Sequence, residues 1–75
     1  MERTVTIKTE YINLDALLKL AGLTGTGGEA KLAIQDGAVR LNGAVEIRRT
    51  KKIYPGDVVF YQGDTITVRP SNQGV

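Results

Sequence analysis

The chain contains no cysteine and no histidine, and its only serine is Ser71. Without cysteine the fold cannot depend on disulfides, and a reducing compartment such as the cytoplasm is the expected location. The absence of histidine and cysteine also removes the usual catalytic bases and nucleophiles. We therefore expect a protein without enzyme activity.

Clustered acids and long hydrophobic runs are missing as well. The eight acidic residues are scattered singly, so no two or three carboxylates share a helix face as ligands for a hard cation. The longest apolar neighbourhood, residues 14–23, is interrupted by Asp15 and Lys19 and is too short for a membrane helix. The polar start lacks the apolar core of a signal peptide. The sequence predicts no metal, no cofactor, no small-molecule substrate and no membrane partner.

The length and the balance of residue types predict one small folded domain. Seventy-five residues, with 41% hydrophobic and 24% charged residues, are enough for a single core. We expect one domain over residues 1–75, with residues 70–75 as a flexible tail.

The beginning of the chain predicts a strand and then a helix. Val5 and Ile7 alternate with polar residues, which is the period of a half-buried strand. Apolar residues then recur at spacings of three and four, typical of a helix face, at Leu14, Leu17, Leu18 and Ala21. Asp15 suits the positive end of the helix dipole, and Gly22 marks the end. Lys19 is expected on the polar side.

A second helix is predicted from a capping box at residues 26–29, in which Thr26 and Glu29 each satisfy a backbone donor of the first turn. Its buried stripe is expected to be Ala30, Ala33 and Ile34, and Gly37 ends it. Residues 22–25 are too few for anything but a tight corner, so the two helices should pack together.

Short strands are predicted for the remainder. Val39 and Leu41 should point inward and Arg40 outward, and Asn42-Gly43 is a strong hairpin signal. We expect the return strand to continue through Val45 and Ile47 and to carry residues 48–52. A turn at residues 55–57 should lead into strands at 58–61 and 65–68, with Phe60 or Tyr61 in the core.

Residues 40–52 hold five of the ten basic residues and one acid, Glu46, which gives the segment a charge of +4. The rest of the chain has five basic and seven acidic residues and is slightly negative. A basic cluster on a compact scaffold typically binds phosphates, so the charge predicts nucleic-acid binding along the sugar-phosphate backbone without reading of base edges. Exposed lysines and arginines can also serve only to protect an edge strand from pairing, and this alternative stays open.

The glycine-rich corner at residues 25–30 matches the dinucleotide-binding pattern G-x-G-x-x-A by letter, but a helix and not a strand precedes it. Its glycines suit a close helix corner. The amides of Gly27 and Gly28 could in addition hold one phosphate of a larger ligand.

An ordered set of residues resembles the RNA-binding domain named after small-subunit ribosomal protein four, the S4 or alpha-L motif, over residues 12–61. The set comprises Leu14-Asp15, Leu18, Gly22-Leu23, Thr26, Ala30-Lys31, Ile34, Gly37, Val39, Asn42-Gly43 and Gly56-Asp57. The short stand-alone bacterial type, YaaA and YbcJ-like, is most similar. The resemblance implies an α+β fold, in which two short packed helices lie against a small, mainly antiparallel sheet.

The resemblance also implies that structured RNA, such as ribosomal RNA during ribosome assembly, binds to the second helix and the following hairpin. Carried over from the family are Lys31, Arg40, Arg48, Arg49, Lys51 and Lys52. Candidate secondary contacts are Lys19, Thr26, Gly27, Gly28 and Tyr54, the last by stacking on a base. Asn13 and Gly27 stand where many members have arginine, which shifts the expected face toward the hairpin.

Two other functions remain open from the sequence. The order of strand, helix, Leu-Asn-Gly and Gly-Asp-Val-Val is similar to β-grasp sulfur carriers, but this chain ends Gly74-Val75 and has no terminal diglycine. A protein-interaction adaptor could direct the same basic face toward an acidic protein. Nuclease-sensitive material that co-purifies would distinguish an RNA-binding protein from an adaptor.

Overall fold

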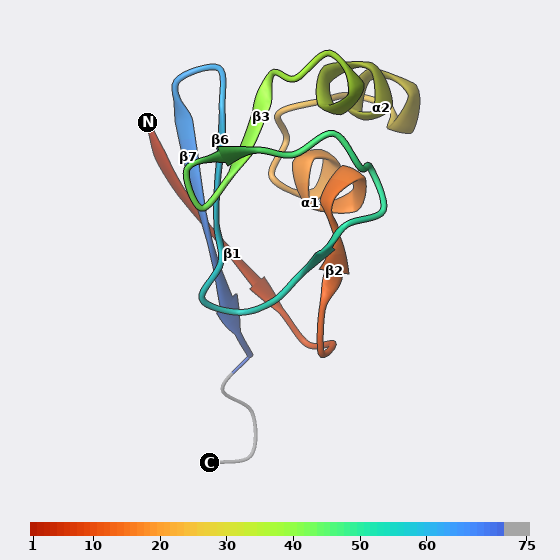
Figure 1. Ribbon diagram of the computed structural model, residues 1–75. Coiled ribbons are helices and arrows are strands. Elements are labelled where there is room, and N and C mark those ends of the chain that lie inside the picture. Colours follow the sequence, from red (N-terminus) through yellow and green to blue (C-terminus); the bar gives the residue numbers. More distant parts are fainter. Residues whose placement is uncertain (72–75) are drawn as a thin grey trace.

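The computed structural model describes residues 1–71, and within them the chain forms two helices and seven short strands (Figure 1). In chain order these are β1 (Glu2–Ile7), β2 (Ile12–Asn13), α1 (Leu14–Leu20), α2 (Gly27–Gln35), β3 (Val39–Leu41), β4 (Ala44–Val45), β5 (Lys52–Ile53), β6 (Val58–Tyr61) and β7 (Asp64–Pro70). Both helices were predicted from the sequence, and the predicted sequence of a strand, two helices and then short strands is confirmed, although β2 and a separate β5 were not predicted.

The main sheet has the strand order β1-β7-β6-β3-β4, and β2 and β5 form a separate two-stranded ribbon. Among the described strands, only the β1–β7 pair is parallel, with Val5 opposite Val68. The other pairs are antiparallel; β3–β4 and β6–β7 are hairpins joined by short turns, whereas β2–β5 and β3–β6 join strands that are further apart in the sequence. The expected α+β fold with a mainly antiparallel sheet is therefore confirmed. The parallel pair was not predicted, because it joins the two ends of the chain.

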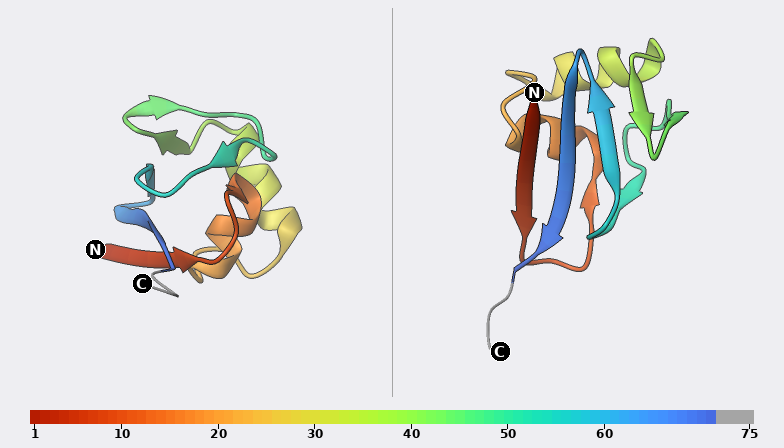
Figure 2. Two further views of the ribbon diagram at one scale, coloured as in Figure 1. Left: turned by 90° about the horizontal axis from the view of Figure 1, so that it is seen from below. Right: turned by 90° about the vertical axis from the view of Figure 1, so that its left-hand side faces the viewer.

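The core lies between the helices and one face of the main sheet. Strand alternation turns Val5, Val59, Ile66 and Val68 toward the helices and leaves the opposite face open to solvent (Figure 2). The side chains that are fully or almost fully buried are Leu14, Leu17, Leu18, Ile34, Val39, Ile53, Val59, Ile66 and Val68. Tyr61 is the buried aromatic residue, whereas Phe60 is 43% exposed on the open face.

The predicted capping box forms at the start of α2. The Oγ1 of Thr26 accepts a hydrogen bond from the Glu29 amide at 3.2 Å, and the Glu29 carboxylate accepts from the Thr26 amide at 3.1 Å. Ala30 and Ile34 are buried, and Ala33 is partly buried against the same core. The sequence therefore predicted both the start and the buried face of this helix.

The hairpin between β3 and β4 has the predicted turn. Asn42 and Gly43 have φ values of 52° and 88°, which match the left-handed turn that suits a two-residue hairpin. The Asn42 side chain also donates to Asp57 at 3.2 Å and accepts from the Val58 amide at 2.9 Å. One asparagine thus joins the hairpin to the turn before β6.

The predicted return strand was wrong beyond Val45. β4 ends there, Ile47 is 60% exposed, and residues 48–51 form a loop that leads to β5. The Glu46 carboxylate accepts a hydrogen bond from the Arg48 amide at 3.1 Å, which turns the chain away from the sheet. Residue alternation alone could not predict this turn, because it depends on a contact between a side chain and the backbone.

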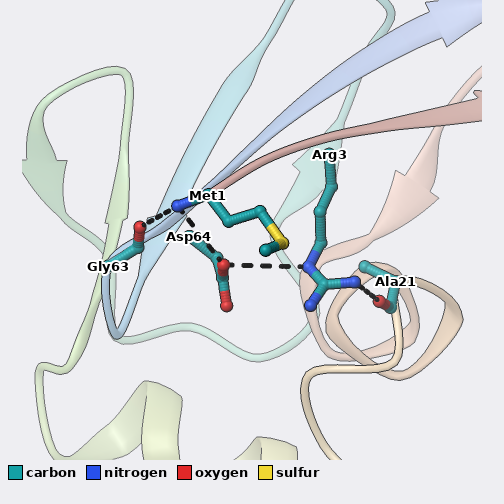
Figure 3. Close-up of polar contacts among 5 residues, drawn as sticks. All are labelled: Met1, Arg3, Ala21, Gly63 and Asp64. Atoms are coloured by element: carbon teal, nitrogen blue, oxygen red, sulfur yellow. Dashed lines mark hydrogen bonds and ion pairs between the residues drawn. The ribbon is translucent and has the colours of Figure 1, made fainter.

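At the edge of the main sheet, Arg3 connects β1 to the helical layer (Figure 3). Its Nη1 donates to the Ala21 carbonyl at the end of α1 at 3.4 Å, and its Nε lies 3.9 Å from the Asp64 carboxylate. The same carboxylate lies 3.6 Å from the amino group of Met1. Arg3 is therefore half-buried and paired.

The last strand is longer than the sequence indicated. β7 continues through Pro70, and the Ser71 amide donates to the Ile7 carbonyl at 2.8 Å. The rest of the expected tail, residues 72–75, lies outside the described residues. Within residues 1–71, neither helix has the length and apolar character needed to span a membrane.

Candidate nucleic-acid interface

Residues 48–52, here called the basic loop, are fixed to the start of α1 through their backbone. The Leu14 amide donates to the Lys51 carbonyl at 2.9 Å, and the Asp15 amide donates to the Arg49 carbonyl at 3.0 Å. These bonds satisfy first-turn amides that the Asn13 side chain does not cap. With these carbonyls bonded to the helix, Lys51 is half-buried and the other residues of the loop are exposed.

Both arginines of the basic loop have an acidic partner. The Nε of Arg48 donates to Glu46 at 3.0 Å, and Nη1 of Arg49 lies 3.7 Å from Asp15. The hydrogen bond from Arg48 holds the pKa of the Glu46 carboxyl below its usual value, and the same bond raises the pKa of Arg48. The two side chains remain 68% and 50% exposed, so an anionic group from solvent can still reach them.

The two lysines differ from the arginines, since no salt bridge to either of them is found within residues 1–71. Lys51 is half-buried and Lys52 is exposed. Together with Arg48, Thr50 and Tyr54, they line a surface depression of about 350 Å³. The structure therefore brings together three of the predicted basic residues and the predicted tyrosine.

The β2–β5 ribbon explains why an aromatic side chain lies beside these cations. Ile12 pairs with Ile53 and Asn13 with Lys52, and Ile53 is buried in the core. The opposite face of the ribbon therefore carries Lys52 and its neighbours in the alternation, Tyr11 and Tyr54. Lys52 Nζ lies 4.9 Å from the centre of the Tyr11 ring, and the two tyrosine rings are 5.9 Å apart between centres.

A second depression, of about 220 Å³, lies where the two helices meet. It is lined by Asp15, Ala16 and Lys19 of α1 and by Gly27 of α2. The structure thus brings together two predicted secondary contacts, and Asp15 connects them to Arg49 of the basic loop. Nearby, the Glu29 carboxylate accepts hydrogen bonds from the Gly25 and Thr26 amides, so a negative group already occupies part of the start of α2.

Two predicted residues lie away from the basic loop in the fold. Arg40 is exposed on the open face of the main sheet, between Val45 and Phe60 on the neighbouring strands. Lys31 is exposed on α2. Within residues 1–71, no hydrogen bond or salt bridge joins either residue to the basic loop, and neither lines its depression.

Sequence reasoning missed Tyr11, Asp15 and Glu46 as parts of this surface. Tyr11 could have been found only by pairing Ile12 with Ile53, which are far apart in the sequence. Glu46 was counted as a lone acid among cations, and its spacing of two residues from Arg48 was the available signal. In the described part of the chain, no group of three or more acidic residues is placed to hold a metal ion.

A sequence comparison now identifies the family. The family model described as the S4 domain matches residues 5–69, which is most of the chain. The chain belongs to the S4 domain family. This membership agrees with the expected resemblance, extends it on both sides of residues 12–61, and separates the chain from β-grasp sulfur carriers.

Individual relatives agree with the family. The chain is 41% identical over 61 residues to YbcJ of Escherichia coli strain K12, by name a candidate RNA-binding protein, with 81% of this chain and 87% of that protein covered. It is 40% identical over 63 residues to RlbA of Bacillus subtilis strain 168, by name a probable ribosome maturation protein, with coverage of 84% and 89%. A match of 44% over 62 residues to tyrosine–tRNA ligase 2 of Pseudoalteromonas translucida covers 81% of this chain but only 16% of the ligase.

The fold is shared with a solved structure as well. The solution structure of YbcJ from Escherichia coli, whose title describes an alpha-L motif involved in RNA binding, superposes with a TM-score of 0.69 at 39% identity. The match covers 88% of this chain and 85% of the other. This S4 domain therefore has the alpha-L fold, in agreement with the sequence prediction.

Proposed function

We propose that this S4 domain is a non-enzymatic bacterial protein of the cytoplasm that binds structured RNA through its basic loop. Ribosomal RNA during ribosome assembly is the proposed target. The arginines bind phosphate oxygens in pairs through their planar groups, and the lysines act as mobile point charges. Lys31, Lys19, Gly27 and Gly28 extend the contact along the two helices.

The observation that carries this proposal is the attachment of the basic loop to α1. Two backbone hydrogen bonds, from Leu14 to Lys51 and from Asp15 to Arg49, hold the loop in one conformation before any ligand arrives. A loop that is already ordered loses less conformational entropy on binding. The attachment therefore supports the proposal, because cations on an ordered backbone bind phosphates at a lower entropic cost.

The names of the relatives support the choice of RNA. YbcJ is named for RNA binding and RlbA for ribosome maturation, and this chain covers most of each protein. A target within the ribosome is therefore the first to test. The match to a tRNA ligase concerns 16% of that enzyme and supports no transfer of its catalytic activity.

Salt dependence of RNA binding tests the proposal. If the four cations of the basic loop each neutralise one phosphate, the logarithm of affinity should fall against the logarithm of salt with a slope of roughly −2.8 to −3.6. Filter retention with fragments of ribosomal RNA measures this slope, and crosslinking in cells identifies the RNA. Indifference to structured RNA in dilute buffer would contradict the proposal.

The adaptor alternative makes a different prediction. A protein-binding adaptor would purify without nucleic acid, whereas an RNA-binding protein should carry nuclease-sensitive material that absorbs at 260 nm. Purification at low salt, with and without nuclease, separates the two functions. Acidic protein and no RNA in the untreated sample would favour the adaptor.

A further inference from the structure

The outer face of the β2–β5 ribbon has an aromatic surface that phosphate binding alone does not use. In its antiparallel register Ile12 lies opposite Ile53, so Tyr11 and Tyr54 flank the same end of the ribbon. Tyr11 and Tyr54 are 37% and 44% exposed, whereas Ile53, the neighbour of Tyr54 in β5, is fully buried. Two exposed aromatic rings beside a basic loop are available for a stacking contact, which is separate from phosphate binding.

The rings and Lys52 form one ordered cluster. The centres of the Tyr11 and Tyr54 rings are 5.9 Å apart, and their planes are tilted by 47°. Lys52 Nζ lies over the Tyr11 ring at 4.9 Å, which is cation–π geometry. Since Lys52 already covers one face of Tyr11, Tyr54 is the ring that is placed to receive a new planar partner.

The backbone of Tyr54 is fixed on both sides. Its amide donates to the Asp57 carboxylate at 2.8 Å, and its carbonyl accepts from the Asp57 amide at 3.0 Å. Asp57 is held in turn by the Asn42 side chain at 3.2 Å. The ring is therefore attached to an ordered turn, and little entropy is lost when a ligand stacks on it.

The depression beside Tyr54 has the size and the lining of a site for one nucleotide. Its volume of about 350 Å³ is at the small end of the range for small-molecule sites. Besides the ring, it is lined by three cations, Arg48, Lys51 and Lys52, and by the hydroxyl of Thr50. The depression thus combines a ring that can stack on a base, cations that can bind the flanking phosphates and a hydroxyl that can bond to a base edge.

We propose that this depression takes a single unpaired nucleotide, whose base stacks on Tyr54 while the cations hold the phosphates on either side. The inference rests on the proposed RNA-binding function and specifies its ligand as a paired RNA helix interrupted by a bulged or looped base. Bases inside a continuous helix have both faces stacked on their neighbours and cannot reach the ring. An unpaired base is free to do so.

Three matched RNA hairpins, each closed by the same non-nucleotide linker so that no loop base is present, test this ligand class on the full chain. The first has one bulged nucleotide in its stem, the second has the same stem without the bulge, and the third has an abasic site at the bulge. Stacking on an aromatic side chain predicts that the first RNA binds about 5-fold to about 100-fold tighter than the other two.

Two variants of Tyr54 and one control variant test whether the preference for the bulged RNA depends on the Tyr54 ring. Tyr54→Phe keeps the ring and should keep the preference for the bulge, whereas Tyr54→Leu should remove it. Phe60→Leu is the matched control, because Phe60 is an aromatic side chain of similar exposure, 43%, on the open face of the main sheet. Its substitution should leave the preference unchanged.

The outcomes separate this inference from the function on which it rests. Equal, salt-dependent binding of all three hairpins would leave RNA binding in place and overturn the unpaired nucleotide. A preference that survives in Tyr54→Leu, or disappears in Phe60→Leu, would also overturn it. Failure of every hairpin to bind at low salt would remove both proposals.

Discussion

Two basic regions of this molecule, Arg3 and the basic loop, are both positively charged but lie in opposite surroundings. The Arg3 guanidinium is directed into the protein, toward the Ala21 carbonyl and the Asp64 carboxylate, and its side chain is 38% exposed. In the basic loop the carbonyls of Arg49 and Lys51 are bonded to α1, and the Arg48 side chain is 68% exposed. The difference is that the Arg3 side chain is used inside the fold, whereas the basic loop is attached through its backbone and leaves Arg48 exposed to a ligand.

The largest expected effect comes from removing all four cations of the basic loop. Replacing Arg48, Arg49, Lys51 and Lys52 with glutamine should lower RNA affinity by about 10³-fold at 0.1 M salt, since each phosphate contact contributes roughly 0.7–0.9 logarithmic units there. Binding isotherms measure the loss, and circular dichroism checks the fold. A folded variant that retains its affinity would move the interface elsewhere.

Within the basic loop, the arginine pair and the lysine pair should contribute differently to the salt dependence of RNA binding. The arginines give up contacts to Glu46 and Asp15 when they bind phosphate, whereas the lysines have no such salt bridge within residues 1–71. Lys51→Ala/Lys52→Ala should therefore flatten the salt slope by about 1.4–1.8, and Arg48→Ala/Arg49→Ala by less. Affinity measured from 50 to 200 mM salt distinguishes them. A larger loss of slope for the arginine pair would contradict this ranking.

The variant Arg3→Gln tests the other basic region of the comparison, in which the cation is paired inside the protein. Loss of its hydrogen bond to Ala21 and its ion pair with Asp64 should lower the free energy of unfolding by about 0.5–1.5 kcal/mol. RNA affinity should not change. Urea unfolding and the RNA assay are both needed, and weaker RNA binding by a fully folded variant would show that Arg3 is part of the interface.

The smallest expected effect is the pH dependence of Glu46. Arg48 lowers the pKa of Glu46 in the folded protein, so the pair stabilises the fold above the ordinary value of 4.5 and this stabilisation is lost as pH falls through the lowered value. Glu46→Gln removes this titration. Stability of the original chain should therefore fall more steeply below about pH 4.5 than that of the variant. Parallel curves would show that the pair does not form in solution.

The sequence predicted what depends on local patterns. Helix α2 was found through its capping box, and the β3–β4 turn through Asn42-Gly43, because both signals involve neighbouring residues. The β2–β5 ribbon and the parallel β1–β7 pair join distant segments, which periodicity does not encode. For the same reason, the position of the basic loop on α1 and the Tyr11–Tyr54 pair could be seen only in the structure.

The sequence located the basic residues, but it did not predict which of them lie together in the fold. Arg48, Lys51, Lys52 and Tyr54 do line one depression. Arg40 is on the open face of the main sheet, because strand alternation turns it away from the helices. Whether it contributes to RNA binding stays a prediction, and so does the contribution of Lys31.

The most direct test is to follow the backbone amides of the folded chain by NMR while structured RNA is added at 0.1 M salt. The account predicts that signals of residues 48–52, together with those of Tyr11 and Tyr54, shift or broaden first, and that those of Arg3 and Asp64 do not. Changes confined to β1 and β7, with the loop signals unmoved, would contradict it.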